Sequence, residues 1–200
     1  ALDWTPPGEE ARAVAVRRAE VLSHAGRAAE AARAYLGAAA GAPSAQAQDL
    51  RRLAAEHLLV IGRVDEGLGL LRPVLAVHGL RFPDTPRGGL LLLLARLVQL
   101  RIRGTALVYP ERAPTEAAFA RVEAAWSAGK GLSSIDPIRS AVFMVEALLG
   151  ALGLGAAALV ARGLAFVGCL YMYDGGVAEE RRGSELLEEA SRIARRIGDP

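Results

Sequence analysis

Apolar side chains recur along the chain at intervals of three and four residues, the spacing that places them on one face of an α-helix. The pattern is clearest in the last segment, 184–197. In the segment over 115–131 the same spacing predicts that Phe119, Val122 and Trp126 face the core. No stretch shows sustained alternation with a period of two, so no β-sheet is predicted.

Glycines, prolines and capping residues divide this pattern into separate helices. Thr85, Thr115 and Asp136 each stand before a predicted helix, where an oxygen side chain can accept hydrogen bonds from the free amides of the first turn. The predicted helices cover about 9–24, 28–40, 45–61, 64–77, 87–103, 115–131, 136–150 and 156–172, and a last one starts at 177 or at 184 and ends at 197.

One motif occurs twice, because residues 19–30 (Ala-Glu-x-Leu-x-x-x-Gly-Arg-x-x-Glu) recur as residues 55–66 at an offset of 36. This offset is close to the period of about 34 residues in tetratricopeptide (TPR) repeats. Chance similarity between alanine-rich helices is the alternative. Each copy predicts two antiparallel helices joined by a short turn, and such hairpins bury their apolar faces by stacking.

We therefore predict an all-α fold, a TPR-like α-solenoid of stacked antiparallel helix hairpins with about eight to ten helices. Residues 1–200 are predicted to form a single helical-repeat region. Its repeats are expected to be more regular over 9–78 and looser over 85–200. The chain ends on a helix-terminating Gly-Asp-Pro sequence, which suggests a fragment of a larger protein.

Composition supports the helical prediction and limits the function. Hydrophobic residues make up 52% of the 200 residues and aromatic residues only 5%, and alanine, the best helix former, is abundant. The 24 basic and 22 acidic residues leave a formal charge of +2. Since nucleic-acid-binding domains usually concentrate basic charge, this balance argues against helical repeats that bind RNA or DNA.

The long apolar stretch at 141–173 raises the question of a membrane, because its only charged residues are Glu146 and Arg162. The uninterrupted apolar run between these charges is shorter than the ~20 residues that a spanning helix needs. Buried helices with small residues at close contacts give the same composition. No membrane partner is therefore predicted.

Residues with catalytic or metal-binding chemistry are sparse and scattered. Cys169 lies in an apolar segment and is interpreted as a small core residue. Glu188 lies one helical turn before Arg192, so an ion pair on a solvated face explains it. The three histidines, His24, His57 and His78, form no HxxxH or HExxH pair, so no metal site is predicted. Taken together, these residues lead us to predict no catalytic residue and no cofactor.

Four charged residues outside the apolar stripes are candidates for contact with a partner. Arg101 and Arg103 stand at the end of one predicted helix, and Asp136 and Arg139 open another. Each also has a simpler explanation. Arginine is favourable near a helix C-terminus, and aspartate is a good N-cap.

Three segments resemble a known family: residues 49–68 (DLRRLAAEHLLVIGRVDEGL), 74–83 (VLAVHGLRFP), and 126–139, which begins Trp-Ser and ends Ile-Asp-Pro-Ile-Arg. They are similar to the C-terminal TPR-like region of large bacterial serine/threonine protein kinases that also contain an AAA-type NTPase module. The resemblance covers about residues 45–200. It implies that phosphoryl transfer takes place outside these residues, which contain none of the kinase motifs.

These observations favour a non-catalytic, cytoplasmic scaffold for protein–protein interaction and regulation. The expected partners are a protein or peptide, or attached kinase and NTPase domains, and no nucleic acid. The alternative is an effector-sensing helical domain that binds a small ligand and signals to an attached kinase or NTPase.

Overall fold

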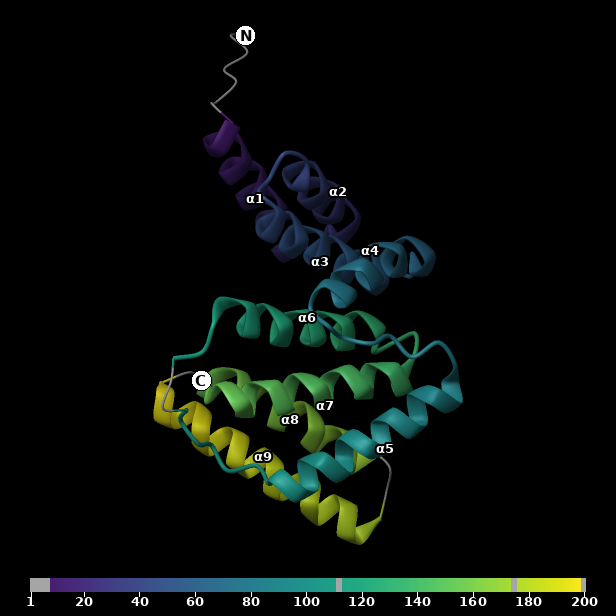
Figure 1. The fold of residues 1–200 in the computed structure, drawn as a ribbon, viewed down its shortest axis with the longest axis vertical. Coiled ribbons are helices and arrows are strands. Elements are labelled where there is room, and N and C mark those ends of the chain that lie inside the picture. Colours follow the sequence, from purple (N-terminus) through teal and green to yellow (C-terminus); the bar gives the residue numbers. More distant parts are fainter. Residues whose placement is uncertain (1–7, 111–112, 174–175, 199–200) are drawn as a thin grey trace. The chain divides into compact units, whose positions relative to one another are not determined.

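Helices are the only regular secondary structure in the residues that the structure of the chain, a computed structural model, describes. Nine helices and no strand are found within residues 8–110, 113–173 and 176–198 (Figure 1). The predicted all-α fold is therefore confirmed. The chain divides into two compact units, residues 1–77 and 78–200, which are described separately.

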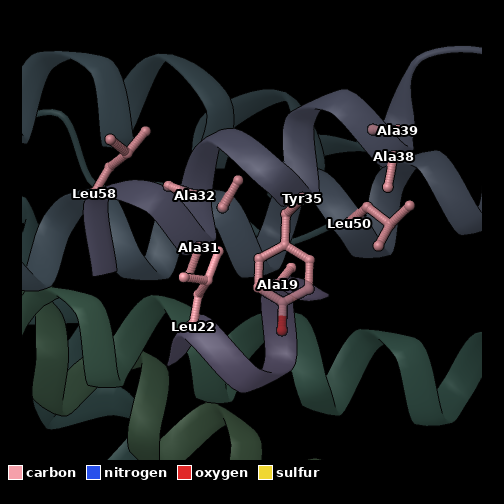
Figure 2. Packing of buried hydrophobic residues seen from close by; sticks show 10 residues of the cluster. Ala19, Leu22, Ala31, Ala32, Tyr35, Ala38, Ala39, Leu50 and Leu58 are labelled. Carbon is pink, nitrogen blue, oxygen red and sulfur yellow. The ribbon is translucent and has the colours of Figure 1, made fainter. Parts of the chain in front are cut away.

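In the first unit each helix packs against the next one along the chain (Figure 1). The turns between them are short, so consecutive helices run antiparallel. Tyr35 is the largest side chain of the shared core and is only 4% exposed. Its ring stacks on His57 at a centroid distance of 5.8 Å, and alanines and leucines surround it (Figure 2). The helices are α1 (Gly8–His24), α2 (Ala28–Ala39), α3 (Ser44–Val60) and α4 (Val64–Val77).

The repeated motif forms the same turn in both copies. Gly26 and Gly62 adopt left-handed conformations, with φ of 72° and 79°, which any residue with a Cβ would adopt only under strain. The amide of Arg27 donates to the carbonyl of Leu22 at 2.9 Å, and Arg63 makes the equivalent bond at the same distance. This is the Schellman geometry that ends a helix. The predicted helix–turn–helix is thus confirmed in both copies.

The arginine and glutamate of the motif also pair with each other. Arg27 donates through Nε and Nη2 to the two carboxylate oxygens of Glu30, at 2.7 and 2.6 Å. Arg63 forms the same ion pair with Glu66. The hydrogen bond from Arg27, together with the positive charges of nearby arginines, lowers the pKa of Glu30 below its ordinary value of 4.5.

Arg27→Ala is expected to return the pKa of Glu30 towards its ordinary value, because it removes both hydrogen bonds to the carboxylate. A carboxyl group with a lowered pKa in the folded state adds stability above its unfolded pKa and loses it as the pH falls through the folded value. Carboxyl chemical shifts followed by NMR titration measure this change. Arg51→Ala, on an exposed position of α3, is the control and leaves the titration unchanged.

In the second unit α7 is the central helix. It packs against three others, and α9 packs against α8 (Figure 1). The three predicted N-caps are confirmed, since Thr85, Thr115 and Asp136 each accept a hydrogen bond from the amide three residues later. The helices are α5 (Pro86–Arg103), α6 (Glu116–Leu132), α7 (Pro137–Leu154), α8 (Ala157–Tyr173) and α9 (Val177–Ile197).

The two charges of the long apolar stretch connect the helices of this unit. Glu146 on α7 forms ion pairs with Arg96 on α5 and with Arg121 on α6, each at 2.6 Å. Arg162 on α8 pairs with Glu123 on α6 at 2.8 Å. Its guanidinium also lies 4.0 Å from the ring centroid of Trp126, on α6. Both charges therefore have an ion-pair partner within the unit.

Two predictions about single side chains are wrong. Phe119 is 39% exposed, whereas Val122 is buried as predicted and Trp126 is half-buried. Cys169 is exposed and does not belong to the core. Helical spacing places these residues on their helices correctly, but it does not say which part of a face a neighbouring helix covers.

Candidate functional site

Helix α5 is fixed to the second unit by one face. Leu100 and Gly89 are buried on that face, and a Cβ added to Gly89 would lie 3.4 Å from Cγ2 of Ile138. The ion pair from Arg96 to Glu146 anchors the middle of the helix. The helix against which α5 packs is α7. The rest of its circumference faces away from the unit.

That outer face carries large apolar side chains. Leu91, Leu94, Val98 and Ile102 are spaced by three and four residues, so they form one stripe along the helix. They are 68%, 51%, 57% and 82% exposed. We call these four residues the α5 stripe. Scattered exposed apolar residues are ordinary, whereas a contiguous row of this kind is a candidate for a binding surface.

All charged residues of α5 are positive, since the helix has four arginines and no Asp or Glu. Arg87, Leu94 and Arg101 follow each other at intervals of seven residues, which places both arginines along the Leu94 edge of the stripe. Neither arginine forms an ion pair with any residue in the part of the chain that the structure describes. Both are exposed.

A cavity of about 590 Å³ opens where the C-terminal end of α5 meets α9. Arg101 lines it together with Tyr171 at the end of α8 and with charged residues of α9. Arg182 lies over the Tyr171 ring, with its guanidinium carbon 5.4 Å from the ring centroid. Four other charged residues of α9 around the cavity form pairs along the helix, Arg181 with Glu185 and Arg192 with Glu189. The partner of Arg192 is thus Glu189 and not Glu188, which corrects the predicted pair.

The four predicted partner-binding residues do not come together, because they lie at opposite ends of α5. Arg101 and Arg103 are in its last turn. At the other end Arg139 donates from Nε to the carbonyl of Pro83 at 2.7 Å, just before α5 begins.

Three of the four side chains have partners within the unit. Arg103 donates to the carbonyls of Gly104 and Ala106 and, at 2.8 Å, to that of Leu152. Asp136 caps α7 and pairs with Arg139. These contacts give Arg103, Asp136 and Arg139 a structural role. The side chain of Arg101 is exposed and lines the cavity. A role of the four in binding a partner stays a prediction.

Metal chemistry has no visible basis in the described ranges, which contain no group of three or more His, Cys, Asp or Glu side chains placed to hold an ion. One helix there, Pro137–Leu154, is long and apolar enough to cross a membrane, and 56% of its apolar window is buried inside the structure. Comparison with protein-family models, curated proteins and solved structures finds no match to this chain.

Sequence reasoning missed the α5 stripe. The leucine run at 90–94 surrounds the helix, so its spacing does not distinguish a covered face from an exposed one. The absence of any acidic residue from 86 to 103 was the available signal, since a helix exposed to water usually carries charges of both signs.

Proposed function

We propose that the chain is a TPR-like scaffold, built from stacked antiparallel helix hairpins, that binds proteins and has no catalytic role. The twice-formed Gly-Arg turn supports the repeat architecture, because the same sequence closes two hairpins with the same geometry. The resemblance to the C-terminal region of bacterial serine/threonine kinases supports a regulatory role. In that setting attached kinase or NTPase domains are candidate partners, and the location is the cytoplasm.

The observation that carries this proposal is the exposed α5 stripe. Burying a large aliphatic side chain completely is worth about 1.5–3 kcal/mol. Four such residues that are half or more exposed therefore offer about 5 kcal/mol to a molecule that covers them. A surface of this kind is costly in water and is typical of a binding interface.

Site-specific photocrosslinking tests the scaffold function. A photoreactive amino acid at Val98 is expected to form protein adducts in cells of the source organism, and the same group at Arg51 forms none. Leu91→Asp is expected to remove the adduct while leaving the circular dichroism spectrum unchanged, because Leu91 is 68% exposed. Equal labelling from Val98 and Arg51 would contradict a docking role for α5.

A second function, the sensing of a small effector, is favoured by the cavity between α5 and α9. Its volume of about 590 Å³ lies in the range of ligand pockets. Its lining carries charges of both signs, and Arg101 and Arg182, which form no ion pair within the described residues, are the groups that would contact an anionic ligand. A screen of anionic metabolites by thermal shift tests this function: a ligand should raise the melting temperature of the chain but not that of Arg182→Ala. If no compound shifts the melting temperature, the effector-sensing function is rejected and the scaffold function is the one that stands.

A further inference from the structure

The partner of α5 can be described more closely from the charges that border its stripe. We propose that α5 binds an amphipathic helix with one acidic edge, whose apolar side chains cover the α5 stripe and whose carboxylates meet Arg87 and Arg101. This inference rests on the proposed scaffold function. It adds the chemistry of the partner, which that function leaves open.

The geometry of the stripe suits a helix. Leu91, Leu94, Val98 and Ile102 follow the three-and-four spacing of one helix face and form a row one side chain wide. A second helix laid along this row would place its own apolar residues at the same spacing between them. From Leu91 to Ile102 the stripe is about 16 Å long at 1.5 Å per residue, which is about three helical turns.

The two arginines set the charge of the partner. Arg87 and Arg101 are fourteen residues apart on the same edge, about 21 Å along the helix axis. Arg87 lies in the first turn of α5, which contains no acidic residue and where the helix dipole already contributes positive charge. An approaching carboxylate would relieve this repulsion. Arg101 adds the positive charge that selects a second carboxylate at the other end.

A second copy of the chain is disfavoured as the occupant. Two α5 helices placed face to face in the antiparallel arrangement would bring Arg87 against Arg101. In the parallel arrangement the arginine edge of each helix would meet the uncharged edge of the other, which carries Ala95 and Gln99. Since α5 has no acidic residue, neither arrangement offers a compensating charge. Like charges that face each other across an interface oppose binding.

A lipid bilayer is also a poorer match than a helix. Amphipathic helices that lie in a membrane interface keep a strongly polar face in water opposite their apolar face. The face of α5 opposite the stripe instead carries the buried Gly89 and Leu100 and packs against α7.

Selection from a displayed library of helical peptides tests the proposal on the full chain. The library fixes leucines at the spacing of the stripe and randomises the edge positions. We expect Asp and Glu to be enriched at two edge positions fourteen residues apart. Against Arg87→Glu/Arg101→Glu the same positions should be enriched in Lys and Arg instead. A selected acidic peptide should bind the double variant at least about tenfold more weakly, a loss of about 1.4 kcal/mol.

Four other outcomes would overturn the proposal. Enrichment without acidic bias would leave α5 as an apolar docking face with no charge selectivity, so the scaffold function would stand and this inference fail. Binding of phosphatidylglycerol vesicles in place of any peptide would identify a membrane surface, and a dimer in light scattering that Val98→Asp abolishes would identify a second copy. No enrichment at all would remove α5 as a helix-binding face, whereas crosslinking from Val98 would still decide whether a protein of another shape covers the α5 stripe.

Discussion

Gly183→Val is expected to destabilise the second unit by about 3 kcal/mol, because it forces apart two helices that touch through their backbones. A Cβ at Gly183 on α9 would lie 2.6 Å from Cγ of Met172 and 2.7 Å from the carbonyl oxygen of Gly168 on α8. Met172 can move, but the carbonyl belongs to the helix backbone. A valine at this position therefore requires α9 to shift as a whole.

Denaturant unfolding followed by circular dichroism measures this loss, and hydrogen exchange assigns it to residues 78–200. Gly153→Ala is the matched control in the same unit, because Gly153 lies inside α7 with nothing within 4 Å of its added Cβ. That change should be neutral or stabilise by up to about 1 kcal/mol. A loss smaller than 1 kcal/mol for Gly183→Val would show that α8 and α9 do not meet at backbone distance.

The same contacts explain the composition of the long apolar stretch. A Cβ at Gly163 would lie 3.0 Å from Cβ of Leu148, and one at Gly168 would lie 3.0 Å from the carbonyl oxygen of Gly183. The interpretation of its small residues as close helix contacts is therefore confirmed at these positions. Small residues allow the helix axes to approach, and the large ones fill the space on either side.

Local signals in the sequence were sufficient to locate the helices. Thr85 and Asp136 act as caps because their oxygen atoms reach amides only three residues away. Gly26 and Gly62 end helices through bonds within their own turns. Such contacts depend on neighbours in sequence, so a single sequence contains the information for them.

The coverage of each face depends on long-range packing, and here prediction failed. Phe119 has the spacing of a core residue but lies near the start of α6, where it remains 39% exposed. The α5 stripe is the larger case, because the leucine run at 90–94 places apolar side chains on every side of the helix and α7 covers only one of them. Three of the predicted partner-binding residues form hydrogen bonds within the unit. Arg103 and Arg139 bond to carbonyls distant in sequence, and Asp136 bonds to the amide of Arg139. Only the folded structure shows which of these hydrogen bonds form.

Glu146→Ala is expected to cost about 3 kcal/mol, because one carboxylate neutralises two arginines from different helices. The Glu146 side chain is 14% exposed, while those of Arg96 and Arg121 are 32% and 40% exposed. Removing one partner of a buried pair costs about 3–5 kcal/mol, and the partial exposure of the arginines places this case at the lower end. Arg121 also donates to the carbonyl of His78 at 2.6 Å, so the start of the unit is expected to loosen as well.

The control separates this cluster from an ordinary surface pair. Glu185→Ala removes the partner of Arg181, a pair at 3.6 Å with side chains 65% and 80% exposed, and should change the unfolding free energy by less than about 0.5 kcal/mol. Hydrogen exchange should accelerate in α5 and α6 for Glu146→Ala and stay unchanged for Glu185→Ala. If the two variants unfold at the same denaturant concentration, Glu146 does not connect α5 to α6, and the α5 stripe loses the anchor that presents it to a partner.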